Sequence, residues 1–275
     1  MKYSCEEEFL NSYNPDKFDR LSMTADILVI SVSNKEKTNT RGNDNKVMSI
    51  LLVKREGYPF KDRYCLPGGF LNPKDETLEE CAKRVLKSET NLEDIYLEQL
   101  YTFDSINRDP RMRVVSTSFV SLIDKNKITN MINKNASWFD IESITEKDNI
   151  VSIKLNNGTC SFELKIKQEL RDKTTDRYKY TGLDNKLIAF DHDIVILTGL
   201  NRIRNKLSYT DIVFNMMPEY FTLKELQQVY EIILGKKLLD PAFRRMIMDK
   251  VVKTDLMESG IGHRPSALYK YIKNF

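Results

Sequence analysis

The sequence predicts an α/β protein with two parts, and three observations support this prediction. A Gly-Gly segment leads into a short amphipathic helix at residues 66–92, and β-rich runs surround it from residue 24 to residue 141. Two capped helices and a strand-like run lie between residues 220 and 272. At 275 residues the chain is long enough for about two domains. We therefore expect a β-rich domain with one internal helix, followed by a small helical domain.

The segment at residues 66–92, LPGGFLNPKDETLEECAKRVLKSETNL, carries signals for both ends of a helix. Thr77 followed three residues later by Glu80 is a capping-box start. Asn91 stands where a left-handed residue ends a helix. The apolar positions between these two signals fall at helical spacing and are Leu78, Cys81, Ala82, Val85 and Leu86.

This layout resembles the Nudix box, the loop–helix signature of the Nudix hydrolase superfamily. The family pattern is Gly, five residues, Glu, seven residues, then Arg-Glu-apolar-x-Glu-Glu-x-Gly-apolar. The matching positions are Gly69, Glu76 (with one extra residue in the loop), Arg84, Leu86, Glu89 and Leu92. Three positions depart from the pattern: Val85 and Ser88 replace Glu, and Asn91 replaces Gly. The resemblance implies a Nudix α/β/α sandwich.

The departures affect the metal site that the resemblance implies. Nudix hydrolases hold Mg²⁺ against a pyrophosphate with helix carboxylates, and the ion activates the attacking water. Val85 and Glu89 are one helical turn apart, so this chain offers one carboxylate where the family offers two. We therefore expect no catalytic residues, no metal and no cofactor. If the chain is instead a hydrolase, Mg²⁺ is its cofactor, and Glu89 and Glu76 are the candidate ligands.

The rest of the first domain reads as strands. The predicted strands lie at residues 24–32, 47–55, 95–103, 114–123 and 136–141. Residues 142–182 exceed a minimal Nudix domain, and alternating apolar residues around Asn157-Gly158 predict a β-hairpin insertion there. We expect a Nudix-like effector-binding domain at residues 1–186, including an N-terminal arm. A connector helix and a second domain are expected at residues 187–275.

The second domain carries the signals of a winged helix-turn-helix. The connector helix is expected to start near Asp191 or Asp193. A further helix runs from the capping box at Thr222 to Gly235. Asp240-Pro241 reads as an N-cap followed by proline, so it starts the next helix, which extends through Val251. A strand-like run at residues 267–272 follows, and in such modules the second helix enters the DNA major groove.

The run FTLKELQQVYEIILGKKLLDPAFRRMI…GHRPSALYKY resembles the C-terminal winged helix of Nudix-related transcriptional regulators, and the match includes Phe190-Asp191-His192. One branch of that family controls NAD metabolism and senses ADP-ribose, and another senses a sugar. The resemblance implies a double-stranded DNA operator and an effector such as ADP-ribose, a related nucleotide or a sugar. We also expect a homodimer on a palindromic site. The alternative is a Nudix hydrolase, a Mg²⁺-dependent pyrophosphatase of ADP-ribose or another nucleoside diphosphate derivative.

The candidate site residues fall into two groups. Arginine suits bidentate recognition of phosphate, although Arg113 has the alternative of pairing with an acid within the fold. The candidate ligand-binding residues are Arg55, Gly68, Gly69, Arg108, Arg111 and Arg113. The candidate DNA-binding residues are Thr222, Arg244, Arg245, Lys250, Lys253, His263, Arg264 and Lys270. Arg84 is expected to contact Glu80, one turn before it.

The composition is that of a soluble globular protein, with 41% hydrophobic and 30% charged residues. The net charge is +3, and residues 236–275 hold nine Lys or Arg against four Asp or Glu. This local surplus either favours a polyanion or is a solvated basic tail. The cysteines form no CxxC pair and the chain has only two histidines, so neither zinc nor a disulfide framework is predicted. No apolar run is long enough for a membrane span, and the N-terminus is unlike a signal peptide, so we expect a cytoplasmic protein.

Overall fold

The computed structural model describes residues 5–34, 46–91, 93, 95–125, 128, 133–172, 174, 177–183, 185–258 and 265–272. The strands of its large sheet are β1 (Ser22–Asn34), β2 (Lys46–Lys54), β3 (Tyr64–Cys65), β4 (Gly68–Phe70), β5 (Tyr96–Phe103), β6 (Val114–Leu122), β7 (Ala136–Lys147), β8 (Ile150–Asn156), β9 (Ser161–Asp172) and β10 (Arg177–Gly182). They form one sheet in the order β10-β9-β8-β7-β2-β1-β6-β5, with β3 paired to β2 and β4 to β1. The central strand β1 is parallel to β6 and antiparallel to β2.

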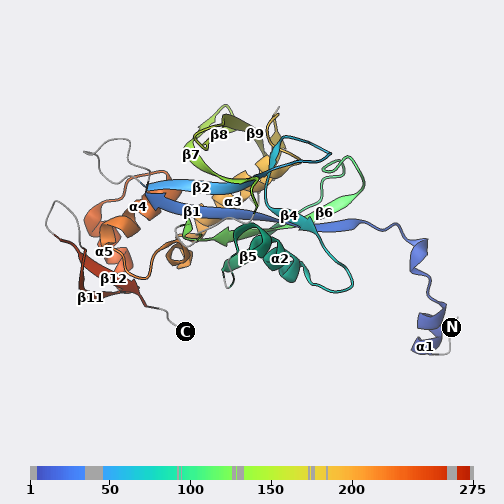
Figure 1. Ribbon diagram of the computed structural model, residues 1–275, viewed down its shortest axis with the longest axis horizontal. Helices are drawn as coiled ribbons and strands as arrows, with labels where there is room; N and C mark the ends of the chain where they lie inside the picture. The colour runs from blue at the N-terminus through green and yellow to red at the C-terminus, as the bar shows by residue number, and fades with distance from the viewer. Residues whose placement is uncertain are drawn as a thin grey trace.

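The sheet is covered by a helix on each face because β1 is apolar on both sides. Leu28 and Ile30 of β1 belong to the core shared with helix α3 (His192–Lys206), and Ile27 and Val29 belong to the core shared with helix α2 (Leu78–Thr90). A strand buried on both faces requires a helical layer on each side. Figure 1 shows α2 and α3 on opposite sides of the sheet. This is the α/β/α sandwich that the resemblance to the Nudix family implies.

Helix α2 begins and ends where the sequence predicts. Thr77 Oγ1 accepts a hydrogen bond from Glu80 N, and the Glu80 carboxylate accepts one from Thr77 N, which completes the capping box. Asn91 has a φ of 57° and closes the last turn in the left-handed conformation. Both signals act within one helical turn, so they depend on neighbouring residues alone.

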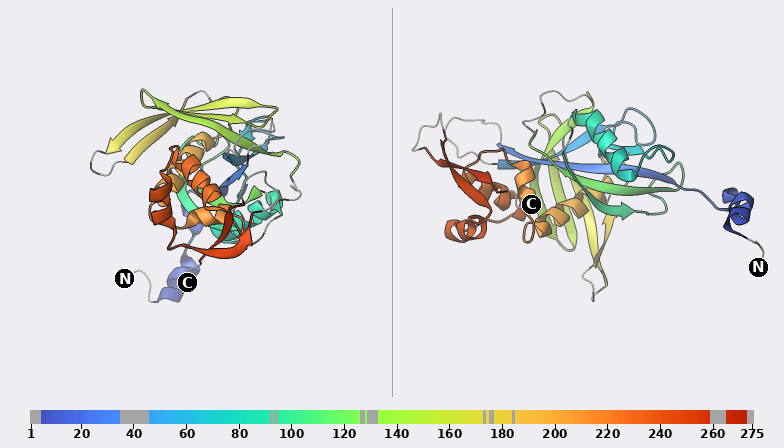
Figure 2. Two further views of the ribbon diagram at one scale, coloured as in Figure 1. Left: turned by 90° about the vertical axis from the view of Figure 1, so that its left-hand side faces the viewer. Right: turned by 90° about the horizontal axis from the view of Figure 1, so that it is seen from below.

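The predicted hairpin at residues 142–182 is part of a larger extension of the sheet. β8 and β9 form the expected hairpin around Asn157-Gly158, and β10 adds a further strand. β7 runs on to Lys147, six residues beyond the expected end, because it pairs with β8. The rings of Phe139, Tyr64 and Phe162 pack together and join this extension to the main core. Both views in Figure 2 show the far ends of β9 and β10 projecting from the body.

The C-terminal domain is the predicted winged helix. It comprises the 3-10 turn η3 (Ile212–Met216), helices α4 (Leu223–Leu234) and α5 (Asp240–Ile247), and the wing strands β11 (Val251–Met257) and β12 (Ala267–Tyr271). Two expectations are wrong. The N-cap of α5 is Leu239, because the Asp240 carboxylate accepts a hydrogen bond from Gln227 across the turn. Val251 is the first residue of β11, where it pairs with Tyr271 of β12, so the helix ends earlier than expected.

The two domains share one hydrophobic core. The cluster that contains Leu28 and Ile50 of the sheet continues through Leu200 of α3 to Leu226 and Tyr230 of α4. The expected boundary at residues 186 and 187 stays a prediction and lies between β10 and α3. The winged helix is therefore packed against the sheet and α3, as Figure 1 shows at the left. Within the described ranges, no helix is both long and apolar enough to cross a membrane.

The N-terminal arm lies at the opposite end of the molecule. It consists of helix α1 (Glu6–Ser12) and the 3-10 turn η1 (Pro15–Lys17), and none of the α1 residues is buried. Figure 1 shows α1 standing away from the sheet, far from α5.

Candidate functional site

The Gly-Gly segment forms β4 rather than a free turn. Gly68 and Gly69 pair with Asp26 and Ala25 of β1. A Cβ atom at Gly68 would lie 2.2 Å from Asp26 Oδ1, and one at Gly69 would lie 3.0 Å from Val85 Cγ2. Glycine is required at position 68 because no side chain fits beside the Asp26 carboxylate. The segment is therefore held between β1 and α2.

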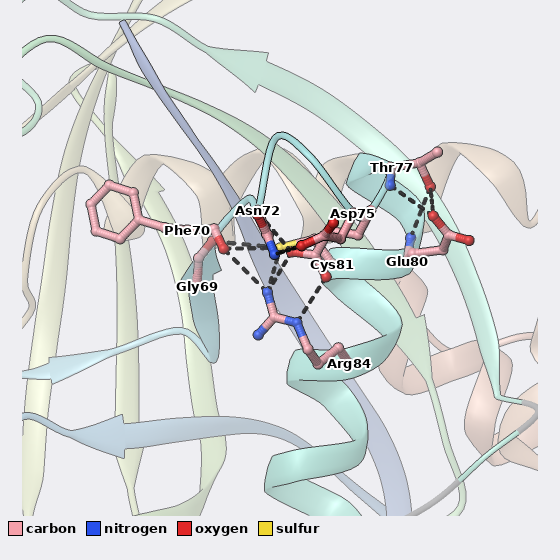
Figure 3. Close-up of polar contacts among 9 residues, drawn as sticks. Gly69, Phe70, Asn72, Asp75, Thr77, Glu80, Cys81 and Arg84 are labelled. Atoms are coloured by element: carbon pink, nitrogen blue, oxygen red, sulfur yellow. Dashed lines mark hydrogen bonds and ion pairs between the residues drawn. The ribbon is translucent and has the colours of Figure 1, made fainter.

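Arg84 pairs with Glu76, the residue that the Nudix pattern matches to its first Glu. Figure 3 shows Arg84 directed toward Phe70, and the capping-box pair of Thr77 and Glu80 beside them. The Nε and Nη2 atoms of Arg84 donate to the Glu76 carboxylate at 2.8 and 2.6 Å, and Nη2 also donates to the Phe70 carbonyl at 3.2 Å. The expected contact with Glu80 is wrong, because the capping box holds that carboxylate on Thr77. The hydrogen bonds from Arg84 lower the pKa of Glu76 to about 2. Glu76 is therefore ionised and engaged within the protein.

The positions that hold metal in Nudix hydrolases carry few ligands here. Val85 is buried in the core beneath α2, and Ser88 Oγ donates to the Val85 carbonyl at 2.7 Å. Glu89 is the remaining carboxylate; burial raises its pKa, and among the described residues its Oε2 has no hydrogen-bond partner. No group of three His, Cys, Asp or Glu in the described part of the chain could hold a metal ion. Because Mg²⁺ requires several oxygen ligands, this donor set does not fit it.

Two arginines of the loop at residues 104–113 face outward near β4. Arg111 Nε and Nη2 donate to Asp109 at 3.0 and 2.8 Å, and the Arg111 guanidinium lies 5.3 Å from the centre of the exposed Phe70 ring. Arg113 is exposed, and within the described residues it makes no ion pair with an acid. Arg111 places a cation beside the Phe70 ring, which suits a phosphate joined to a planar group, and the exposed Arg113 lies two residues further along the loop. We call Phe70, Arg111 and Arg113 the ligand surface.

Arg108 differs from the other two arginines because it points into the protein. Its side chain is 3% exposed and donates to Asp26 at 3.1 Å and to Asp191 at 2.8 and 3.1 Å. The Arg108 guanidinium, predicted to contact ligand, is therefore bound to Asp191, which lies 83 residues away in the sequence.

Arg55 also has partners within the fold. Its Nε donates to the Pro59 carbonyl at 2.8 Å, and its guanidinium lies 4.9 Å from the centre of the Phe190 ring. It therefore sits beside the segment that leads into α3, and its role in ligand binding stays a prediction.

The DNA-binding candidates differ in whether their side chains form ion pairs within the protein. Arg244, Arg245 and Lys253 are exposed, and within the described part of the chain they form no ion pair. Lys250 donates to Asp211 at 2.6 Å, and Lys270 donates to Glu219 at 2.7 Å. These two lysines therefore need to leave a partner before they contact a phosphate.

Thr222 is buried and serves as the N-cap of α4, where its Oγ1 accepts from Glu225 N at 3.1 Å. The capping role accounts for a threonine at this position without a DNA contact. His263 and Arg264 lie outside the described residues.

The residues around Arg108 are those that the sequence analysis did not identify as a site. Asp26 is buried in β1, and His192 Nε2 lies 3.5 Å from its carboxylate. The one sequence signal is an acid within the apolar run TADILVISV, where a charge requires a partner. That signal predicts a partner without saying which residue provides it.

Comparison with known proteins gives matches over almost the whole chain. Residues 32–155 match the NUDIX domain family, and residues 213–271 match the NrtR DNA-binding winged helix domain. The ADPR responsive transcriptional repressor NtrR of Acinetobacter baylyi is 30% identical over 275 residues, which cover 98% of this chain and 90% of that protein. The chain belongs to the family of Nudix-related transcriptional regulators.

Two further proteins are similar to this chain, one a DNA-binding protein and one an enzyme. The structure of Shewanella oneidensis NrtR complexed with a 27mer DNA has a TM-score of 0.63 and 25% identity, covering 91% of the regulator and 93% of that chain. The ADP-ribose pyrophosphatase of Methanocaldococcus jannaschii is 38% identical over 102 residues, covering 37% of the regulator and 58% of the enzyme. The first match spans both domains and the second is restricted to part of the chain.

The capping role of Thr222 can be tested against a DNA contact. Thr222→Ala removes the acceptor for Glu225 N, so we expect a loss of about 1 kcal/mol in the free energy of unfolding. Thr222→Ser keeps the hydroxyl and should recover most of this loss. Urea unfolding followed by circular dichroism measures both variants. An alanine variant with wild-type stability and weaker DNA binding would instead indicate a contact with DNA.

Glu89 should make the stability depend on pH. Burial raises its folded-state pKa, so the charged form is disfavoured in the fold, and the cost is present at neutral pH. Glu89→Gln should therefore raise the melting temperature at pH 7, and the gain should disappear below about pH 4, where the carboxyl is protonated in both states. Thermal unfolding between about pH 3 and pH 8 measures this, with the exposed Glu79→Gln as control. A lower melting temperature for Glu89→Gln at pH 7 would show that a partner stabilises the carboxylate.

Proposed function

We propose that this chain is a DNA-binding transcriptional regulator whose Nudix domain senses ADP-ribose or a closely related metabolite. One observation supports it above the others. The Nudix scaffold retains β4, α2 and the Arg84–Glu76 pair, while Val85 and Ser88 stand where the metal carboxylates of the hydrolases belong. A domain of this kind is suited to binding a pyrophosphate without cleaving it.

The ligand surface supports the chemistry of the effector. Arg111 and Arg113 are exposed cations, and Phe70 provides an exposed ring beside Arg111. ADP-ribose contains a pyrophosphate, which arginine binds, and an adenine ring, which stacks on aromatic side chains. The Acinetobacter baylyi relative is an ADPR responsive repressor, which favours ADP-ribose over a sugar.

The winged helix supports the DNA partner. Arg244 and Arg245 lie together on α5, the second helix of the helix-turn-helix, and both are exposed. In such modules this helix reads base edges, and neighbouring cations contact phosphates. A location in the cytoplasm, with access to DNA, follows from this role.

The alternative is an ADP-ribose hydrolase with a C-terminal appendage. The partial match to a pyrophosphatase and the intact Arg84–Glu76 pair favour it. It requires a metal, and the described carboxylates at positions that match the Nudix pattern are Glu76, held by Arg84, and the half-buried Glu89. We propose that the protein needs no cofactor. Hydrolysis of ADP-ribose with Mg²⁺ or Mn²⁺ at about 1 s⁻¹ or faster, within the usual enzyme range, would establish the alternative instead.

Two double variants should separate the DNA site from the ligand surface. Arg244→Ala/Arg245→Ala should weaken DNA binding about 5- to 150-fold, the value of one lost base contact, and leave ADP-ribose affinity unchanged. Arg111→Ala/Arg113→Ala should do the reverse and abolish the response to ADP-ribose. Gel shifts at a stated salt concentration, on the DNA upstream of the chain's own gene, measure the first property. Calorimetry with ADP-ribose, and then with simple sugars, measures the second.

The matched control is Lys17→Ala/Arg20→Ala, which removes two positive charges at the far end of the molecule from α5 (Figure 1). This variant should leave the affinity for ADP-ribose unchanged, and it should lower the affinity for DNA only by the small effect of a reduced net charge. DNA affinity that is unchanged in Arg244→Ala/Arg245→Ala would exclude α5 as the recognition helix. A protein that binds no specific DNA would contradict the proposed function.

A homodimer is the expected assembly. One winged helix covers a short stretch of DNA, and two-fold pairing on a palindromic site gives the larger contact that specific binding requires. Light scattering at micromolar concentration should give twice the mass of one chain. A monomer that stays monomeric on adding DNA would be inconsistent with this assembly.

A further inference from the structure

A buried cluster of charged residues lies between the ligand surface and helix α3. Arg108 donates through Nη2 to Asp26, and through Nε and Nη2 to both carboxylate oxygens of Asp191. His192 Nε2 lies 3.5 Å from Asp26, and Ser116 Oγ donates to the same carboxylate. We call these five residues the Arg108 cluster. Neither the ligand surface nor the DNA-binding candidates explain why it is there.

The cluster joins four separate elements. Asp26 lies in β1, Ser116 in β6 and Arg108 in the loop at residues 104–113. Asp191 is the N-cap of α3, and His192 is its first residue. His192 Nδ1 also accepts a hydrogen bond from Leu66 N at 2.9 Å, which places the chain just before Gly68 in the same arrangement. The loop, β4 and the start of α3 are therefore held in one fixed geometry.

The charge balance of the cluster indicates a role in geometry rather than in net stability. Burial alone would raise the pKa of Asp26, but His192 and Arg108 hold it well below its usual range, so the carboxylate is ionised. Buried ion pairs contribute little net stability, because desolvation offsets their attraction. Separating one residue from its partner, however, leaves a buried charge unpaired. Partly separated positions of Arg108 and its two carboxylates are therefore unfavourable.

The far end of α3 reaches the winged helix. Arg204 Nε donates to the Ile233 carbonyl near the end of α4 at 3.3 Å. Leu200 and Ile203 of α3 belong to the same core cluster as Val229 of α4. Because close-packed interfaces move as units, a shift at the first turn of α3 changes the position of α4.

The ligand surface acts on the same loop. Arg111 lies three residues after Arg108 and stacks on Phe70 of β4. A ligand bound there contacts the loop on its outer side, while Arg108 holds the inner side of the loop to Asp191. Ligand occupancy and the position of α3 are therefore linked through one short segment of chain.

We propose that the Arg108–Asp191 pair couples ligand occupancy in the Nudix domain to the position of the winged helix, with both residues positioning α3 and neither contacting ligand or DNA. This inference rests on the proposed function and assigns its route of regulation. It also gives Arg108 a role different from that of Arg111 and Arg113. Arg111 and Arg113 determine the affinity for the ligand. Arg108 determines how much bound ligand changes the affinity for DNA.

The test is the coupling factor, the ratio of DNA affinities without and with saturating ADP-ribose. Linkage requires the same factor in ADP-ribose affinity without and with DNA, and factors of about 5 to 150 are typical. Asp191→Asn keeps the shape and removes the charge that faces Arg108. Arg108→Lys keeps the charge and loses the bidentate geometry. In both variants each separate affinity should stay within about threefold of wild type, while the coupling factor falls to within about twofold of one.

The matched control is Glu142→Gln, which removes one carboxylate from an ion pair with Lys154 in the sheet extension, away from the loop and α3. It should keep the wild-type coupling factor. Thermal unfolding first establishes that each variant is folded. If Asp191→Asn does not fold, Arg108→Lys provides the same test because it keeps the net charge of the Arg108 cluster.

Each outcome distinguishes between the two proposals. A full coupling factor in Arg108→Lys or in folded Asp191→Asn would overturn the coupling role and leave the proposed function intact. Loss of ADP-ribose affinity in Arg108→Lys, with normal affinity in Asp191→Asn, would show that Arg108 is a ligand contact instead. A wild-type protein whose coupling factor is one would overturn the proposed function, and this inference with it.

Discussion

The burial of β1 on both faces is the constraint on which the other elements depend. Because Ile27 and Val29 face α2 while Leu28 and Ile30 face α3, neither helix can be absent without exposing half of the central strand. The same strand pairs with β2, β4 and β6, so it fixes the Gly-Gly segment as well as the sheet. A carboxylate in such a strand has to find its partners inside the protein, and Asp26 finds them in the loop and in α3.

The sequence was sufficient wherever the interaction is local. The capping boxes at Thr77 and Thr222 and the left-handed ends at Asn91 and Gly235 lie where expected, because each depends on residues within one turn. The connector helix begins at His192, between the two expected starts near Asp191 and Asp193. The same reasoning assigned Arg84 to the wrong acid, because Glu80 already serves the cap. Helical spacing alone does not say whether Glu80 binds Arg84 or the Thr77 cap.

Contacts between distant segments could not be predicted in the same way. Arg108 and Asp191 are 83 residues apart, and Lys250 and Asp211 are 39 residues apart. No spacing rule joins such residues, because their distance is set by the packing of whole elements. The sequence therefore identified candidate cations for ligand and DNA without distinguishing those directed outward from those held within the fold. Val251 illustrates the same limit, since its pairing with Tyr271 in the wing takes it out of the preceding helix.

The continuous core between the sheet, α3 and α4 limits how this protein can evolve. Domains joined by a free linker can be exchanged or replaced one at a time, because few contacts cross the boundary. Here Tyr230 and Leu226 of α4 pack in the cluster that also holds Leu28 of β1. A different DNA-binding module would need to supply a matching apolar surface as well as its own fold. The Nudix domain and the winged helix are thus expected to change together. A substitution in the shared core on one side of the boundary would require a compensating substitution on the other side.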